Sequence, residues 1–383
     1  MSAFKPKSWH TGPVITISWN TQLDVRSRVD VGVGARRRLP AILGQIGAGK
    51  RVALLSQPYI AAHWFSELMS ALTSDNYQVS TLEVPDGEAC KSADVLLKVW
   101  ADLQGRGFDR KDTVVAVGGG AVCDLSGFVA GTYLRGLNFV SVPTTLLSQV
   151  DAAIGGKTGI NLPSGKNLAG TFYFPKAVLV DPELLSTLPA RQFTSGLAEM
   201  IKYALIEETI AAHTAYEPGP KPLLETMERT FNNSLSFDNA TMPGLISSCI
   251  KMKLSVVGKD PYESGLRRCL NLGHTLGHAI ETVSDYNLSH GEAVSIGLAF
   301  ALRTAVLKKR IDKESMKRIE SLLKKVGLPI QLPDNLPKNK LVDAIGFDKK
   351  RQGKALKFVL PHTRLGLVDF DTNIPVSELA DLL

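Results

Sequence analysis

The stretch TVVAVGGGAVCDLSGFVAGTYL (113–134) determines how the first half of this chain is interpreted. TVVAV (113–117) is a short apolar run of the kind that forms a strand buried on both faces of a parallel sheet. Three glycines follow it, and the remaining residues have the apolar content of a packed helix. A strand, a glycine turn and a helix in this order predict a βα unit with its turn at the carboxyl end of the sheet.

The same alternation extends on both sides of this unit. Further strands are predicted at RVALLS (51–56), VSTLEV (79–84), FVSVP (139–143) and AVLVD (177–181), and helices over 60–74 and 93–107. From about Arg191 the pattern changes to long helical segments, and LKFVLPHTRLGLVDF (356–370) could add a small hairpin. We therefore predict an α/β, doubly wound, Rossmann-like domain over residues 1–187 and a mainly α-helical domain over residues 188–383.

Composition narrows the class of protein. The chain has 383 residues, of which 44% are hydrophobic and 21% charged, as in ordinary globular domains. The formal net charge is +7, but the basic clusters are scattered and lack interleaved aromatic residues, which favours a small anionic ligand over nucleic acid. No apolar run approaches a membrane span and the N-terminus lacks a secretory signal, so we expect a cytoplasmic protein without membrane contact. The four cysteines show no CxxC spacing and are expected to be reduced thiols.

Several glycine-rich segments could bind phosphate. GQIGAGKR (44–51) and AIGGKT (153–158) imitate a Walker motif, but Arg51 replaces the required Ser or Thr in the first and Asp151 replaces the first glycine in the second. The triplet 118–120 is better placed, because it follows a strand and opens a helix, although a simple tight turn explains it equally well. Two glycine-rich loops, 151–159 and 161–167, each carry a lysine and favour a binding crevice for a phosphate-bearing ligand.

The segment LGHTLGHAIETVSDYNLSHGEAV (272–294) contains three of the seven histidines. His274 and His278 are spaced i, i+4, and His290 stands at a predicted helix start. The glutamate of HExxH is missing, which argues against a zincin peptidase. Glu199 lies one helical turn before Lys202, and a carboxylate with two imidazoles would leave positions open on a metal for substrate. A packed or capping histidine pair is the alternative, and the spacing does not decide which histidines bind a metal.

The chain resembles the 3-dehydroquinate synthase family of the sugar-phosphate cyclases in segments that keep the family's order and spacing. These segments are VGGGAVCDLSGFVAGTYLRG (117–136), VPTTLLSQVDAAIGGKTGINLPSGKNLAGTFYFPKAVLVD (142–181), LPARQFTSGLAEMIKYALI (188–206), GLRRCLNLGHTLGHAIE (265–281) and HGEAV (290–294). They cover well over a third of the chain. None of these segments would indicate the family alone, but together they make a specific match to it.

The resemblance implies a site for each ligand. A divalent metal, usually Zn²⁺ with Co²⁺ as the alternative, would be bound by Glu199, His274 and His290, while His278 would face the substrate. The residues implied for NAD are Asp86, Glu88, Lys91, Gly119, Gly120, Ala121, Val122, Asp124, Thr144, Thr145, Asp151, Lys157, Lys166, Leu184 and Thr187. Those implied for an anionic sugar-phosphate substrate are Lys157, Asn167, Lys202, Lys253, Arg267, Asn271, His278, and Lys349 or Lys350.

Three further expectations come with the resemblance. Arg135 would reach the substrate phosphate of a neighbouring subunit, which implies a homodimer. Cys123 replaces a usual glycine beside the pyrophosphate, and Ser56 stands where many members carry Asp or Asn for the adenosine ribose. Both departures would affect the affinity for the cofactor and leave the chemistry unchanged.

The implied reaction converts 3-deoxy-D-arabino-heptulosonate 7-phosphate to 3-dehydroquinate and phosphate, a lyase reaction of the shikimate pathway. It proceeds by transient NAD-mediated oxidation, β-elimination of phosphate, reduction, and intramolecular aldol cyclisation. A valiolone-type cyclase acting on sedoheptulose 7-phosphate is the main alternative. Its substrate has no carboxylate, so Arg267 and Asn271 argue against it. A metal-dependent polyol dehydrogenase is less favoured because of the GGKTGIN and SGKN segments, and a nucleic-acid binder is supported by net charge alone.

Overall fold

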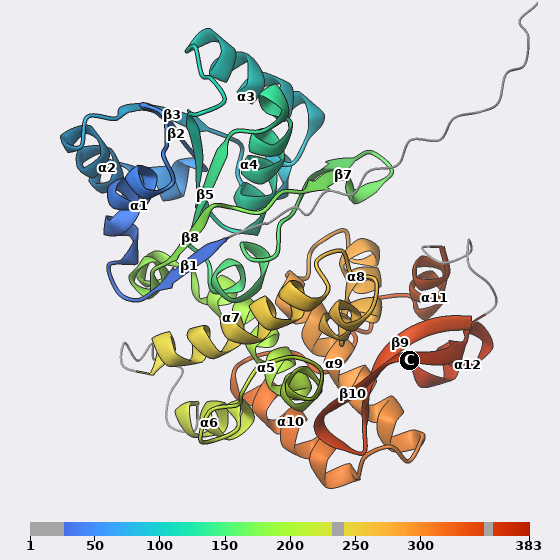
Figure 1. Ribbon diagram of the computed structural model, residues 1–383. Coiled ribbons are helices and arrows are strands. Elements are labelled where there is room, and N and C mark those ends of the chain that lie inside the picture. The colour runs from blue at the N-terminus through green and yellow to red at the C-terminus, as the bar shows by residue number, and fades with distance from the viewer. Residues whose placement is uncertain (1–26, 232–240, 348–354) are drawn as a thin grey trace, which may run out of the picture.

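The computed structural model describes residues 27–231, 241–347 and 355–383 (Figure 1). The predicted substrate residues Lys349 and Lys350 lie outside these ranges. The first half of the chain forms a sheet body and the second half a helical body beside it. None of the helices in the described ranges is long and apolar enough to cross a lipid bilayer.

Six parallel strands form the main sheet in the order β1-β8-β5-β4-β2-β3. The strands are β1 (Arg28–Val31), β2 (Arg51–Ser56), β3 (Gln78–Glu83), β4 (Thr113–Gly118), β5 (Asn138–Pro143) and β8 (Ala177–Val180). The chain passes from β2 to β3 on one side and returns to β4 on the other side of β2. The strand order therefore reverses between β2 and β4, and the carboxyl ends of strands at such a switch point form the usual ligand crevice of open α/β sheets.

Helices cover both faces of this sheet. They are α1 (Leu39–Gln45), α2 (Pro58–Ser74), α3 (Ala93–Gly105) and α4 (Gly120–Thr132). In β4, Val115 and Val117 join the apolar cluster beneath α1 and α2, whereas Val114 and Ala116 join the cluster that includes α3 and α4. Because alternate side chains are buried on opposite faces, strands such as β2 and β4 are continuous apolar runs, and this is why their positions could be predicted closely.

A second, two-stranded sheet forms where two loops were predicted. Strands β6 (Lys157–Leu162) and β7 (Gly165–Phe172) make an antiparallel hairpin that carries both lysines of the glycine-rich segments. A Cβ added at Gly170 would lie 2.2 Å from the carbonyl oxygen of Thr158 on the opposite strand. Glycine here permits close backbone approach within a strand, which sequence reasoning interpreted as a loop signal. Strand β1 was also not predicted.

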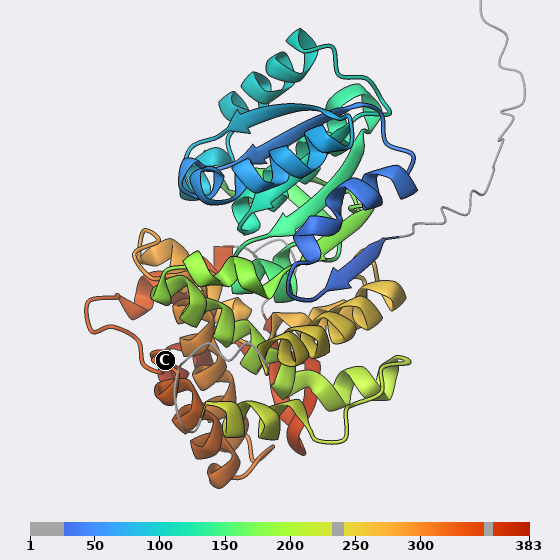
Figure 2. The same cartoon turned by 90° about the vertical axis from the view of Figure 1, so that its left-hand side faces the viewer.

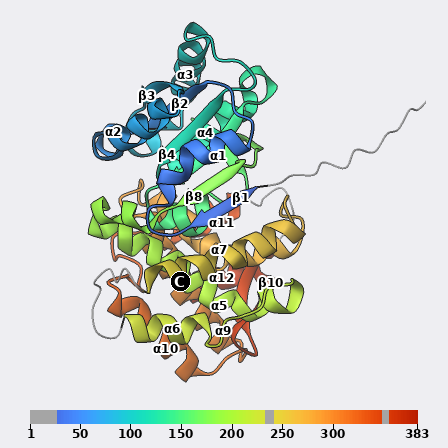
Figure 3. The same ribbon diagram turned by 60° about the vertical axis from the view of Figure 1, so that its left-hand side comes forward.

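The second half is mainly helical, as predicted, and its helices lie below the sheet body in Figures 2 and 3. Its helices are α5 (Ala190–His213), α6 (Leu223–Thr230), α7 (Met242–Lys259), α8 (His274–Val283), α9 (His290–Leu307), α10 (Lys313–Lys325), α11 (Lys338–Phe347) and α12 (Val376–Leu382). The hairpin β9 (Ala355–His362) and β10 (Arg364–Pro375) lies where one was expected. The predicted domain boundary after residue 187 falls between the sheet body and α5 and stays a prediction.

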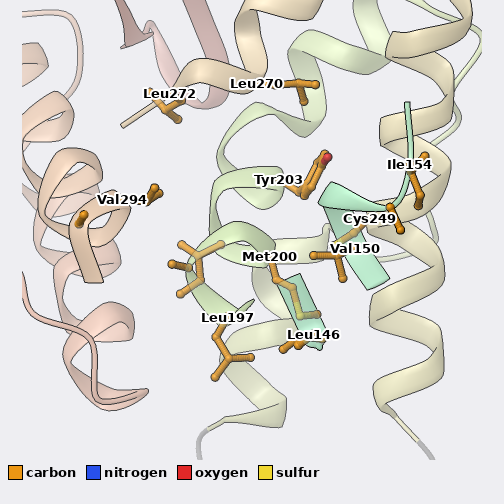
Figure 4. Packing of buried hydrophobic residues seen from close by; sticks show 14 of the residues in the cluster. Leu146, Val150, Ile154, Leu197, Met200, Tyr203, Cys249, Leu270, Leu272 and Val294 are labelled. Atoms are coloured by element: carbon orange, nitrogen blue, oxygen red, sulfur yellow. The ribbon is translucent and has the colours of Figure 1, made fainter. Parts of the chain in front are cut away.

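Helix α5 is the central helix of the helical body. Figure 4 shows Leu197, Met200 and Tyr203 of α5 among the buried apolar side chains, with Leu146 and Val150 from the segment after β5. Polar side chains of α5 are buried in this setting too, because the helix is covered on most sides. A charge placed here therefore needs a partner of opposite charge or a cation.

Two glycines bring α5, α8 and α9 unusually close together. A Cβ at Gly291 would lie 2.2 Å from the carbonyl oxygen of Ser195, and a Cβ at Gly297 would lie 1.9 Å from that of Gly273. The Gly291 amide donates to the Ser195 hydroxyl at 2.8 Å. Since real Cβ atoms do not approach backbone oxygens this closely, glycine is required at both positions for α9 to pack against the other two helices.

We expect Gly297→Ala to lower the free energy of unfolding by roughly 1–3 kcal/mol, because the added methyl must push α8 and α9 apart. Gly258→Ala is the matched control, since Gly258 lies on exposed α7 surface and a Cβ there meets nothing within 4 Å. The free energy of unfolding of the control should rise by up to about 1 kcal/mol, because alanine has a higher helix propensity than glycine. Guanidinium unfolding followed by far-UV circular dichroism measures both. Equal effects of the two substitutions would contradict the close packing.

Candidate active site and metal centre

The open end of α4 lies at the switch point of the sheet. Gly119 is the N-cap residue, no side chain caps the helix, and its first turn has no acidic residue. Nearby, the Thr144 hydroxyl is buried without a hydrogen-bond partner among the described residues. Free amides at a helix N-terminus attract anions, so this end of the sheet fits the pyrophosphate of a dinucleotide. The predicted residues Gly119, Gly120 and Thr144 are brought together here.

The two departures from the family pattern are both buried, and the Cys123 thiol lies 3.7 Å from the carbonyl oxygen of Gly118 in the glycine turn. The Cys123 thiol is buried and lies 3.3 Å from the Ser141 hydroxyl, and burial raises the pKa of the thiol to about 12. The Ser56 hydroxyl is buried and donates to the carbonyl of Val117 at 2.6 Å, so it cannot meet a ribose. The next residue, Gln57, donates to the carbonyls of Pro85 and Gly87 at 3.1 and 3.0 Å. Gln57, not Ser56, is therefore the residue at this strand end that contacts the predicted cofactor loop.

All four cysteines are unpaired and buried, as expected for reduced thiols packed in the core.

The predicted cofactor residues around η2 (Gly87–Cys90) form a connected set. Lys91 is buried and donates to Asp124 at 2.6 Å and also to Asn167. Burial raises the pKa of Asp124 to about 6 even though Lys91 opposes the shift. Asn161 joins this set to Glu88, because its amide donates to the Glu88 carboxylate at 2.9 Å while its oxygen accepts the Asn167 backbone amide at 3.0 Å.

Four other predicted cofactor residues differ in exposure. The side chains of Val122 and Leu184 are buried in the apolar clusters, so only their backbone could meet a ligand. Thr187 is partly exposed, and its hydroxyl accepts the indole N–H of Trp64 at 3.3 Å. Asp86 is exposed on the loop before η2.

Asp151 joins the glycine turn to the helical body. It lies in η4 (Ser148–Ala152), whose Ala152 side chain would sit 3.2 Å from a Cβ at Gly120. The Asp151 carboxylate accepts Lys253 Nζ at 2.8 Å and the Tyr203 hydroxyl at 2.6 Å. Burial alone would raise the pKa of Asp151, but the ammonium groups of Lys253 and Lys202 outweigh burial and hold it well below its usual range.

Lys202 continues this series of contacts to Glu199. Its Nζ lies 3.7 Å from Asp151 Oδ1 and forms an ion pair with Glu199, three residues earlier in α5. Both side chains are 1% exposed. Burial lowers the pKa of Lys202, but the two carboxylates reverse the shift and keep it charged. The glycine turn and Glu199 therefore belong to one continuous site.

Glu199, His274 and His290 converge on a common point. Glu199 Oε1 lies 3.4 Å from His274 Nε2 and 3.3 Å from His290 Nε2. One ligand atom from each of the three residues lies within 4.8 Å of the others. Both oxygens of the buried Glu199 carboxylate lack a hydrogen bond of acceptable geometry from the described residues, although Lys202 lies against one of them. A buried carboxylate without donors and two imidazole nitrogens aimed at it fit a divalent cation.

The two imidazoles differ in charge. Burial lowers the pKa of His274 to about 3 despite the nearby Glu199, so this ring is neutral and can offer a lone pair. Burial also disfavours the charged form of His290, but the carboxylates of Glu199 and Glu281 outweigh it and raise its pKa to about 10. A proton on His290 thus occupies the place between carboxylates that a cation would take.

His278 is exposed, whereas His274 one turn earlier is partly buried. The centres of the two rings lie 5.4 Å apart and those of His278 and His290 lie 6.3 Å apart. The cluster of potential ligand atoms among the described residues does not include His278. His278 therefore lies beside the convergence point, and its role toward substrate stays a prediction.

The predicted substrate residues of the hairpin and of η6 (Leu266–Asn271) meet at Glu263. Lys157 forms an ion pair with Glu263, and the Asn271 amide donates to the same carboxylate at 2.8 Å. Arg267 is 2% exposed and donates to the carbonyl of Gly155 at 3.0 Å, so it supports the turn that precedes Lys157. Arg267 and Lys253 both lie against Gly155, which brings this group next to the lysines that bind Asp151.

Arg135 lies elsewhere. It is exposed at the far end of α4, which has 13 residues and is therefore about 20 Å long. Leu134 and Arg135 both have positive φ, 48° and 64°, a conformation that non-glycine residues seldom adopt. Arg135 has no ion-pair partner within the described ranges. The arginine is thus held out from the sheet body, away from the glycine turn of its own chain.

Sequence reasoning missed several residues of this site: Gln57, Asn161, Tyr203, Glu263 and Glu281. Gln57 contacts the predicted cofactor loop, and each of the others contacts a predicted residue through tertiary structure. For all but Glu281, no spacing in the sequence signals the contact. Glu281 had the clearest signal, because it lies seven residues after His274 and so on the same face of α8.

The fold places a parallel α/β sheet with an open helix end beside a mainly helical body that carries a candidate metal centre. A solved 2-deoxy-scyllo-inosose synthase, in complex with carbaglucose-6-phosphate, NAD⁺ and Co²⁺, has this fold with a TM-score of 0.81 and 24% identity, covering 93% of this chain and 95% of that one. A 2-epi-5-epi-valiolone synthase from Streptomyces hygroscopicus, with NAD⁺ and Zn²⁺ bound, also has a TM-score of 0.81 and 24% identity, covering 96% of this chain and 98% of that one.

Sequence relatives identify the family within this class. Residues 81–195 match the N-terminal region of 3-dehydroquinate synthase and residues 196–351 match its C-terminal region. A 3-dehydroquinate synthase of Nostoc punctiforme is 40% identical over 356 residues, covering 90% of this chain and 94% of the relative. The chain belongs to the 3-dehydroquinate synthase family, and the resemblance found in the sequence is confirmed.

We expect Glu199→Gln and His274→Ala to lose bound zinc, because each removes a ligand from the convergence point. His278→Ala is the matched histidine control and should retain zinc near the parent level. Metal content per chain, measured by inductively coupled plasma mass spectrometry after dialysis, tests this. An equal loss of zinc in all three variants would show that His278 has been wrongly excluded from the ligand set.

Proposed function

We propose that this protein converts 3-deoxy-D-arabino-heptulosonate 7-phosphate to 3-dehydroquinate and inorganic phosphate, with NAD and a divalent metal, Zn²⁺ or Co²⁺, as cofactors. One observation carries the proposal within this family. Contacts run without interruption from Gly120 through Ala152 and Asp151 to Lys202 and Glu199. A nucleotide bound at the glycine turn and a cation bound at Glu199 would therefore act on the same ligand.

Each cofactor has residues suited to it. Glu199, His274 and His290 would hold the cation, and the open end of α4 at Gly119 and Gly120 would hold the pyrophosphate. When bound, NAD⁺ accepts and later returns one hydride, while the cation polarises the oxygen on the same carbon. Because the hydride returns, the net reaction is a phosphate elimination with ring closure.

The phosphate of the substrate has candidate partners on the hairpin. Lys157 is exposed on β6 and is neutralised by Glu263, so a phosphate dianion would compete with that carboxylate for the ammonium group. Asn167, which has a φ of 56° and is paired with Lys91, lies on the neighbouring strand. The two groups would orient the leaving phosphate for β-elimination, a positioning effect worth several kcal/mol.

Proton transfer and recognition of the substrate carboxylate fall to the helical body. His278, exposed beside His274, is placed to exchange a proton with a ligand over the metal centre. Lys202, Lys253 and Asp151 form a buried charge network beneath the same point. Arg267 and Asn271 add positive charge and an amide that suit a carboxylate, which favours the heptulosonate over sedoheptulose 7-phosphate.

A homodimer is part of the proposal. Arg135 stands at the end of α4 remote from the glycine turn, where it would reach the phosphate site of a second copy of the chain. The strained backbone at Leu134 and Arg135 supports a functional reason for this conformation. The cytoplasmic location expected from the sequence stays a prediction.

Purified protein supplied with NAD⁺, Zn²⁺ and the heptulosonate phosphate should release inorganic phosphate and form a product without net formation of NADH. A coupled phosphate assay and absorbance at the NADH wavelength measure the two quantities. Sedoheptulose 7-phosphate is the matched control substrate, since it keeps the phosphate and lacks the carboxylate. Phosphate release from the control alone would move the assignment to a valiolone-type cyclase, and stoichiometric NADH would indicate a dehydrogenase.

A further inference from the structure

The two candidate histidine ligands are oriented in the same way. Each ring points Nε2 at Glu199 Oε1, and each places Nδ1 against an acceptor on its other side. For His274 the acceptor is the carbonyl oxygen of Leu272 at 3.1 Å, and for His290 it is Glu281 Oε2 at 3.4 Å. A neutral ring that donates from Nδ1 keeps the lone pair on Nε2, which is the atom aimed at the metal centre, so a cation would replace any proton on Nε2.

The two acceptors differ in what they can do. The Leu272 carbonyl is fixed by the backbone and is neutral. Glu281 is a charged side chain on α8 that is 9% exposed, seven residues after His274. Because that spacing is close to two helical turns, Glu281 and His274 share the face of α8 that meets the start of α9, where His290 lies. A carboxylate in this place makes the ring a stronger ligand than a carbonyl does, since it stabilises the positive charge that metal binding induces.

Glu281 has a second contact, which crosses to the sheet body. Its Oε1 lies 3.8 Å from Lys166 Nζ on β7, and the same ammonium group lies 3.7 Å from the centre of the Tyr286 ring. The ion pair is long and Lys166 is partly exposed, so it contributes little to stability. Its significance is geometric, because Lys166 contacts one oxygen of the carboxylate while the other oxygen faces His290, an orientation that a rotation away from His290 would disrupt.

We propose that Glu281 is a positioning residue for the metal centre, which fixes the Nδ1–H tautomer and the ring orientation of His290 and is itself held in place by Lys166 of the hairpin. The inference rests on the proposed metal site. Glu281 does not contact substrate or cation in this account, and it acts only through the imidazole. Lys166, which the resemblance implies for NAD, thereby contacts Glu281 beside the metal centre. The two candidate cofactor sites are thus connected through Lys166 and Glu281 as well as through Asp151.

Zinc affinity, measured on the full chain by competition with a chromophoric chelator, tests the proposal without reference to turnover. Glu281→Ala should weaken zinc binding about 10–100-fold, the usual effect of removing such an outer partner. Glu281→Gln should fall between Ala and the parent, because the amide oxygen still accepts from Nδ1 but carries no charge. Glu208→Gln is the matched control, since Glu208 is a partly exposed acid on α5 paired with Arg364, and its zinc affinity should equal that of the parent.

A second readout separates positioning from folding. The visible spectrum of Co²⁺-loaded protein should change in Glu281→Ala and stay unchanged in Glu208→Gln, because only the first alters a ligand's orientation. The proposal is overturned if Glu281→Ala leaves both the zinc affinity and the cobalt spectrum unchanged, whether or not the melting temperature falls. If Glu199→Gln also kept full zinc affinity, the metal site itself would be refuted, whereas loss in Glu199→Gln with no change in Glu281→Ala refutes the positioning role alone.

Discussion

A buried carboxylate is the constraint on which the rest of this structure depends. Glu199 is 1% exposed in the central helix, and its oxygens lack hydrogen bonds of acceptable geometry among the described residues. A lone charge in such surroundings would be strongly destabilising. Lys202 offsets part of the charge, and the two imidazole nitrogens aimed at Oε1 leave room for a cation to offset the remainder. The arrangement is stable as a whole only if something positive occupies that point, either a proton on His290 or a metal.

The partners of this carboxylate lie on separate elements of the fold. Glycines at 291 and 297 let the start of α9 approach α5 and α8, so that His274 and His290 reach Glu199. On the other side, the reversal of strand order places the glycine turn of β4 next to η4, whose Asp151 binds two lysines of the helical body. The nucleotide end of the sheet and the candidate metal centre are therefore joined by charge pairs as well as by chain connectivity.

The inner strands of the main sheet could be predicted because burial on both faces leaves a plain apolar run, as RVALLS at β2 shows, whereas the short edge strand β1 lacks such a run. The hairpin β6–β7 could not, because glycines such as Gly170, which permit its strands to approach, are also the residues that indicate loops. The family resemblance supplied the candidate ligands residue by residue. It could not supply Glu263, Asn161 or Glu281, whose contacts depend on how distant segments meet. It marked Ser56 as a departure from the Asp or Asn that many members carry for the ribose, and the Ser56 hydroxyl is bonded inside the sheet.

A crystal structure of the protein with NAD⁺ and zinc, with anomalous diffraction recorded at the zinc edge, tests the central claim most directly. The account predicts one strong anomalous peak within bonding distance of Glu199, His274 and His290, with the nicotinamide ring on the same side and His278 unligated. A peak coordinated by His278 in place of one of these residues would contradict it. So would a peak away from Glu199, or a nicotinamide ring that does not face the metal.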